Sequence, residues 1–142
     1  MPLPKRLTIP ECEAMLVARL ERRGYRVICQ PCMDSGMVDS KRRLVRYGYA
    51  DPTTRLATLA HEYAHTLGRE PAYMGNLIMA FCFGKLDACC QVWRYELLIW
   101  QRADRILRWL NPKGFSWSKH ARRKAQNFAR ELRMIARQVR CD

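Results

Sequence analysis

The chain has 142 residues, of which 49% are hydrophobic and 27% charged, so it is long and apolar enough to fold around one core. This composition argues against a disordered chain, and no apolar run has the length of a membrane span or the form of a secretory signal. The formal net charge of +13 predicts attraction to an anionic partner. We therefore expect one cytoplasmic domain over residues 1–142, without a membrane partner.

The first predicted element is a helix over residues 11–23. Thr8 and Glu11 have the spacing of a capping box, in which each side chain accepts a hydrogen bond from the other residue's backbone, and Pro10 suits the first helical turn. Gly24 is placed to end the helix. The residues expected to face the core are Met15, Leu16, Ala18 and Leu20.

Two stretches rich in β-branched and aromatic residues follow, at residues 25–30 and 37–50. Apolar and charged residues partly alternate in both, as they do in strands with one buried face. A turn is predicted between them at residues 33–36. These signals predict a small antiparallel sheet.

A helix of about four turns is predicted next, over residues 53–67. Asp51 can cap its first turn, Pro52 suits the first helical position, and Gly68 suits the end. The apolar residues that should pack this helix into the core are Leu56, Leu59, Ala60, Tyr63 and Leu67.

The rest of the chain predicts more helix. Residues 68–75 are expected to form a loop, and the short apolar segment 76–84 is interpreted as a helix. A long helix is predicted over residues 86–110, ended by the sequence NPKG. Its apolar row consists of Val92, Ile99, Ala103, Ile106 and Leu110.

A basic helix is predicted at about residues 117–140, with Ser116 or Ser118 as its cap. Its inward face should comprise Ala121, Phe128, Leu132, Ile135 and Val139. The elements together predict the α+β class. We expect a mainly helical domain in which the small antiparallel sheet packs on the helix of residues 53–67.

Two histidines of that helix, His61 and His65, are four residues apart and so lie on one face, where both ring nitrogens can reach one metal ion. Glu62 points off this line, but its carboxylate can reach a metal-held water and act as general base. Three small residues beside the histidines should leave room for the ion: Ala57, Ala64 and Gly68. The alternative is a pair of ordinary hydrogen-bonded histidines with a solvated Glu62.

A third ligand is predicted on the helix of residues 86–110. Glu96 places a carboxylate on the otherwise apolar row of this helix, and a buried anion needs a counter-charge. A zinc ion would supply that charge and complete a His, His, Glu set, whereas an ion pair with an arginine is the alternative. The fallback ligands are Asp87, Glu70, Asp104 and His120, of which Asp104 could instead orient an imidazole from outside the coordination shell.

His61, Glu62 and His65 in HEYAH match the HExxH signature of the zincin metallopeptidases, and Glu96 on a later helix resembles the gluzincin branch. The order of elements is similar to that of small ImmA/IrrE-type or phage-encoded peptidase domains. The resemblance implies one Zn²⁺ held by His61, His65 and Glu96, with Glu62 as the general base. It also implies hydrolysis of a peptide bond in an intracellular protein, and the basic charge would suit a DNA-associated substrate.

The same resemblance implies a substrate laid along an edge strand, for which residues 43–48 are our expectation. An oxyanion in such a reaction needs a hydrogen-bond donor, and the candidates are Tyr95, Tyr73 and Tyr49. Tyr95 is favoured because it is next to Glu96 in the chain.

Two weaker signals remain. The seven cysteines are expected to be reduced, and Cys29 and Cys32 with Cys82, Cys89 or Cys90 fit only half of a structural zinc framework. The basic C-terminal helix is either a solvated face or a surface that meets phosphates. The alternative function is therefore a nucleic-acid-binding protein with a structural or relict metal site, using Arg122, Arg123, Lys124, Arg130, Arg133 and Arg137.

Overall fold

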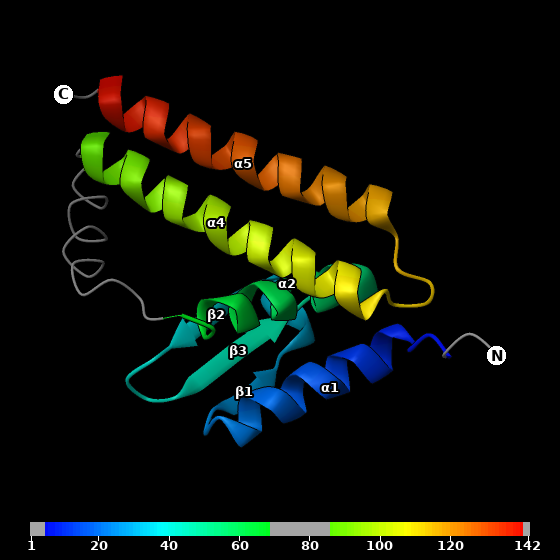
Figure 1. Cartoon of the computed structure of the whole chain (residues 1–142). Coiled ribbons are helices and arrows are strands. Elements are labelled where there is room, and N and C mark those ends of the chain that lie inside the picture. The colour runs from blue at the N-terminus through cyan, green and yellow to red at the C-terminus, as the bar shows by residue number, and fades with distance from the viewer. Residues whose placement is uncertain (1–4, 69–85, 141–142) are drawn as a thin grey trace.

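The computed structural model describes residues 5–68 and 86–140 and confirms the α+β class (Figure 1). The segment 76–84, interpreted as a helix, lies outside these residues. The elements in chain order are α1 (Ile9–Arg22), β1 (Arg26–Cys29), the short 3₁₀ helix η1 (Pro31–Met33), β2 (Ser35–Asp39), β3 (Leu44–Gly48), α2 (Pro52–His65), α4 (Leu86–Leu110) and α5 (Trp117–Arg140).

The capping box at the start of α1 is confirmed. The Glu11 backbone N–H donates to Thr8 Oγ1 at 3.3 Å, and the Thr8 N–H donates to Glu11 Oε1 at 3.3 Å. Leu16 and Leu20 are buried as expected, but Ala18 is exposed. The helix buries Cys12 instead, because a row with helical spacing from Leu16 passes through position 12 and not through 18.

The sheet is mixed, so the expected antiparallel arrangement is wrong in this respect. The strand order is β1-β3-β2, with β1 parallel to β3 and β2 antiparallel to it. The chain passes from β1 through η1 to the far side of β3 instead of turning back as a hairpin. β3 is the central strand, and in agreement with this its apolar residues Val45 and Tyr47 are almost completely buried. Residues 43–48 are therefore not an edge strand, and the edges are β1 and β2.

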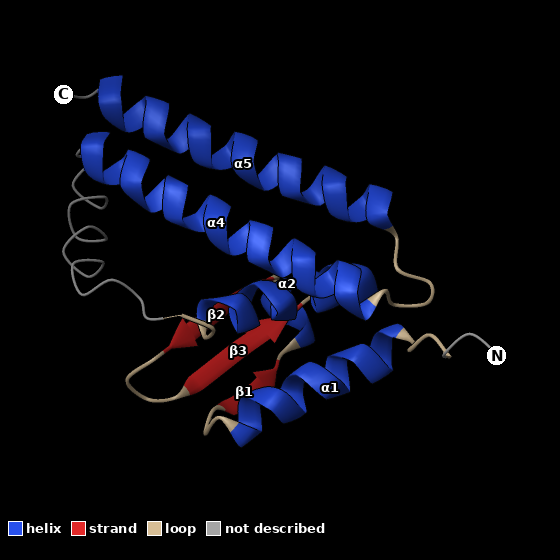
Figure 2. Cartoon of the chain, in the orientation of Figure 1, coloured by secondary structure: helices blue, strands red, loops and turns tan. Residues whose placement is uncertain are grey.

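Helix α2 is the central element, and it contacts α1, β2, β3, α4 and α5 (Figure 2). Asp51 caps it by accepting from the Thr54 N–H at 2.9 Å. The helix ends at His65 and not at Gly68, since Thr66 forms the C-cap and its hydroxyl donates to the Tyr63 carbonyl at 2.7 Å. Leu67 lies beyond this cap and is 44% exposed, which corrects its predicted place in the core.

Helices α4 and α5 run antiparallel beside each other (Figure 2). On α4, the predicted row is inward, with Ile99, Ala103 and Leu110 buried. On α5, Ala121 and Leu132 are exposed, contrary to the prediction. The helix contacts α4 through His120, Lys124 and Phe128 instead, and of these only Phe128 was expected to face inward. Phe128 and Ile135 are half-buried, and the side chain of Val139 lies outside the described set. In the described parts of the chain, no helix combines the length and the apolar character that crossing a membrane requires.

Gly48 ends β3 where the strand meets the start of η1. A Cβ atom at this position would lie 1.7 Å from the Gln30 carbonyl oxygen. We therefore expect Gly48→Ala to lower the free energy of unfolding by about 2 kcal/mol or more, since backbone must move. Urea unfolding measures this, with Ser35→Ala on the paired position of β2 as the control, expected within about 0.5 kcal/mol of wild type. Equal stability of the two variants would contradict the close approach.

Candidate metal centre

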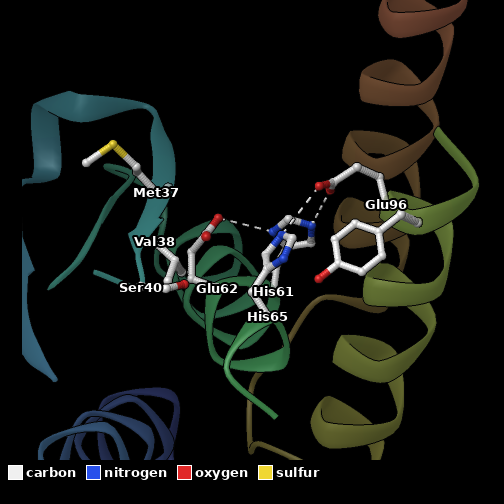
Figure 3. Close-up of a pocket in the computed structure, with 9 residues that line it drawn as sticks. Met37, Val38, Ser40, His61, Glu62, His65 and Glu96 are labelled. Atoms are coloured by element: carbon white, nitrogen blue, oxygen red, sulfur yellow. Dashed lines mark hydrogen bonds and ion pairs between the residues drawn. The ribbon is translucent and has the colours of Figure 1, made fainter. Parts of the chain in front are cut away.

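A cleft of about 320 Å³ lies between the C-terminal half of α2, the edge strand β2 and the middle of α4 (Figure 3). All three predicted ligands and the predicted base line it. Its lining residues are Gly36, Met37, Val38, Ser40, His61, Glu62, His65, Tyr95 and Glu96. The chain thus brings together side chains that are 35 residues apart in sequence, as the contact between His61 and Glu96 shows.

The carboxylate of Glu96 meets both imidazoles of α2. Its Oε2 lies 2.9 Å from His61 Nε2, and its Oε1 lies 3.4 Å from His65 Nε2. The ligand atoms of the three residues lie within 4.8 Å of one another. Among the described residues, this triad is the group of His, Cys, Asp or Glu side chains that could hold a metal ion.

Without metal, His61 is a buried cation between the carboxylates of Glu62 and Glu96. Burial alone would lower the pKa of His61, but hydrogen bonds with Glu62 and Glu96 outweigh it and raise the pKa to about 9. Burial alone would raise the pKa of Glu96, but the hydrogen bonds with His61 and His65 lower it to about 2. An ionised carboxylate and a protonated imidazole therefore neutralise each other where a metal cation would otherwise sit.

Glu62 is buried, with 5% of its surface exposed, and its Oε1 lies 3.1 Å from His61 Nδ1. This contact leaves His61 Nε2 directed at Glu96, since the two ring nitrogens face different carboxylates. An acid that binds the second nitrogen of a ligand histidine fixes its orientation. Glu62 thus both lines the cleft and holds one predicted ligand in place.

Gly36 is a site residue that sequence reasoning missed. A Cβ atom there would lie 2.6 Å from Glu62 Oε1 and 2.8 Å from Thr58 Cγ2, so only glycine lets β2 pass this close to the base. The usual signal for such an approach is an isolated glycine within a strand. Gly36 lies in the stretch 33–36, for which the sequence predicts a turn. Room at the site comes from Gly36, whereas the predicted spacers Ala57 and Ala64 are buried and line no part of the cleft.

The tyrosine candidates fall in different places. Tyr95 lines the cleft, with its ring centroid 5.7 Å from that of His65. Tyr49 lies elsewhere, since its hydroxyl accepts from Arg123 Nη2 at 2.8 Å and the Arg123 guanidinium stacks on its ring. Tyr49 is therefore excluded as a donor to the cleft, and Tyr73 lies outside the described residues.

Trp100 is a second residue that sequence reasoning missed. Its ring centroid lies 4.3 Å from that of His61, with the planes tilted by 35°. Trp100 and Asp104 follow Glu96 at intervals of four residues, so the three share one face of α4. Asp104 accepts a hydrogen bond from His120 Nε2 at 2.8 Å and one from the Lys124 ammonium group, both on α5.

Two of the four fallback ligands, Asp104 and His120, are engaged with each other. Asp104 does orient an imidazole, but it is that of His120, which is itself buried 6.1 Å from the Trp100 ring. Glu70 and the side chain of Asp87 lie outside the described set. Cys29 and Cys32 are exposed and belong to no group of three metal ligands among the described residues, while Cys82 is not described.

The charge state of His61 predicts how the metal-free protein responds to pH. The folded pKa is raised from 6.5 to about 9, so the stabilisation is fully present below 6.5 and is lost as pH rises through 9. We expect the loss to be roughly 2 to 3 kcal/mol, measured by urea unfolding in the presence of a chelator. Glu96→Gln removes one of the two acids that raise the pKa of His61, so this variant should lose the stabilisation at a lower pH than wild type does. A flat profile in wild type would contradict the ion pair.

The contact of Trp100 with His61 predicts an effect on metal affinity. Trp100→Leu should weaken zinc binding by roughly tenfold or more, because the imidazole loses the surface that limits its rotation. A competition titration with a coloured chelator measures this at a temperature where the variant is folded. Trp109→Leu is the matched control, since Trp109 is on the same helix and is 67% exposed. Equal zinc affinities in the two variants would remove Trp100 from the centre.

Comparison of the chain with models of protein families, with curated proteins and with solved structures finds no match. The likeness to the zincins thus rests on His61, Glu62, His65 and Glu96 themselves.

Proposed function

We propose that the protein is a zinc-dependent metallopeptidase that hydrolyses peptide bonds of a protein substrate. The observation that supports this most is the convergence of two imidazoles from α2 and one carboxylate from α4 on a cleft that also contains the buried Glu62. A structural zinc site is closed by four protein ligands and would need no open cleft beside it.

The donor set fits zinc. Catalytic zinc sites commonly combine histidines with a glutamate and keep one position for water or substrate. Ligands in a tetrahedron with bonds of about 2 Å are separated by about 3.3 Å. The ligand atoms of His61, His65 and Glu96 lie within 4.8 Å of one another, so small side-chain movements would bring all three to one ion. The ion would take over the neutralising charge that protonated His61 supplies without metal.

Zinc, when bound, supplies a Lewis acid for the scissile carbonyl and lowers the pKa of a water molecule. Glu62 would take a proton from that water while the water oxygen attacks the carbonyl carbon. Glu62 then passes the proton to the amide nitrogen as the C–N bond breaks. The Tyr95 hydroxyl is the proposed donor to the carbonyl oxygen as negative charge develops on it.

The substrate strand is proposed to lie along β2. This strand is at the edge of the sheet, and Gly36, Met37 and Val38 line the cleft. Edge strands offer unpaired N–H and C=O groups, to which an extended peptide can add. The close approach of Gly36 to Glu62 would then bring a peptide bond paired with β2 near the base.

Replacement of the base separates catalysis from metal binding. Glu62→Gln has nearly the same shape and keeps an oxygen that can accept from His61 Nδ1, but it cannot take up a proton, so hydrolysis should fall by about 10²- to 10⁴-fold while zinc content is retained at saturating zinc. The measurements are zinc stoichiometry by elemental analysis and turnover of a mixture of fluorescence-quenched peptides.

Glu21→Gln is the matched control, because Glu21 is an exposed acid on α1 away from the cleft. It should leave both zinc content and turnover unchanged. A Glu62→Gln variant that cleaves as fast as wild type would remove Glu62 from the reaction. Purified wild-type protein that takes up no zinc would remove the proposed function altogether.

A further inference from the structure

A group of exposed cations lies near one end of the cleft. Helix α2, the turn after β2 and the end of α1 all reach this end of the molecule (Figure 1). We call these cations the basic rim. It consists of Arg22, Arg23, Arg26, Lys41, Arg42 and Arg43.

The basic rim is continuous with both walls of the cleft. On the sheet side, Ser40 lines the cleft and Lys41 follows it in the same turn. On the helix side, His65 lines the cleft, and Arg23 Nη1 donates to the hydroxyl of the next residue, Thr66, at 3.2 Å. A chain leaving the cleft past Ser40 would therefore approach Lys41 first, with Arg23 beyond the end of α2.

Hydrogen bonds and a ring contact connect the residues of the rim. The Arg26 N–H donates to the Arg43 carbonyl at 2.7 Å, and Arg43 Nη1 donates to the Arg23 carbonyl at 3.5 Å. The Arg43 guanidinium also stacks on the Tyr25 ring, 5.2 Å from its centroid. These contacts gather like charges that repel one another, and an anionic ligand would relieve that repulsion.

Few acids neutralise the rim. Asp39 pairs with Arg42 at 3.8 Å, and the Arg42 side chain is still 83% exposed. Glu21, next to Arg22 in the chain, is a second acid near the rim, so two acids stand against six cations. The rim therefore has a net positive charge that faces solvent beside the cleft.

We propose that the substrate carries acidic residues in the segment that leaves the cleft beside Ser40, and that the basic rim binds them. This inference rests on the proposed function. It specifies an acidic polypeptide, because the rim adjoins the groove that would hold an extended peptide. The cations of α5, among them Arg130, Arg133 and Arg137, line no part of that cleft.

The first test measures binding without catalysis. The probe is fluorescein-labelled octaglutamate, titrated by fluorescence anisotropy with the full chain carrying Glu62→Gln, at low and at physiological ionic strength. The rim variant adds Arg26→Glu, Lys41→Glu and Arg42→Glu, which are exposed and have few structural contacts. We expect it to weaken binding by about tenfold or more, and higher salt to weaken wild-type binding.

The matched control carries the same change of charge at Lys5, Arg105 and Lys113, which are exposed and are not among the rim or cleft residues. It should bind octaglutamate within about twofold of the parent, because screening limits the reach of distant charges. Equal losses in the two variants would mean that only net charge matters and would overturn the proposal. A single-stranded oligonucleotide bound through the rim while octaglutamate is not would also overturn it, in favour of nucleic acid.

The second test joins the rim to cleavage. The wild-type protein is given two quenched peptide mixtures with the same randomised centre, one ending in four glutamates and one in four serines, with each tail placed at either end. We expect faster cleavage of a glutamate-tailed mixture, and a ratio of rates near one in the rim variant. A ratio that the rim variant leaves unchanged contradicts the proposal. Absence of all cleavage would count against the proposed function, whereas octaglutamate binding still decides whether the rim holds acids.

Discussion

The contact of one carboxylate with two imidazoles organises the site. Glu96 lies on α4, and both histidines lie on α2, so the three side chains join two of the three elements that line the cleft. Such a contact between buried charged groups is stable only when the charges balance. Protonated His61 achieves this without metal, and a divalent cation could achieve it with all three side chains as ligands. The arrangement therefore favours an ion at one position between the helices.

Much of the site could be predicted because it follows from helical spacing. His61 and His65 share a face as residues four apart must, and Glu96 occupies a position on a row that is otherwise apolar. Local signals also predicted the helix starts, since Thr8 and Asp51 cap α1 and α2 as expected. These inferences need only contacts within one turn of the chain.

Other features depend on contacts that no local pattern contains. The composition of β1 and β2 is the same whether they pair with each other or both pair with β3. The prediction of an antiparallel sheet was therefore wrong for β1, which is parallel to β3. Gly36 matters because of Glu62 in a different element, and Trp100 because of His61. A tryptophan on a helix is usually a core residue. Its role at this site emerges only from the packing of α4 on α2.

The arrangement of Glu96, Trp100 and Asp104 on successive turns of α4 has a further consequence for assembly. On one face of α4, Glu96 contacts both histidines, Trp100 packs against His61, and Asp104 binds two side chains of α5. Shaping of the ion site is then coupled to the packing of α5 on α4, and zinc bound there as proposed would stabilise the folded state. Each tenfold rise in its concentration above the dissociation constant would add about 1.4 kcal/mol to the stability of the whole domain. The supply of metal would thus set the stability of the domain as well as the occupancy of its site.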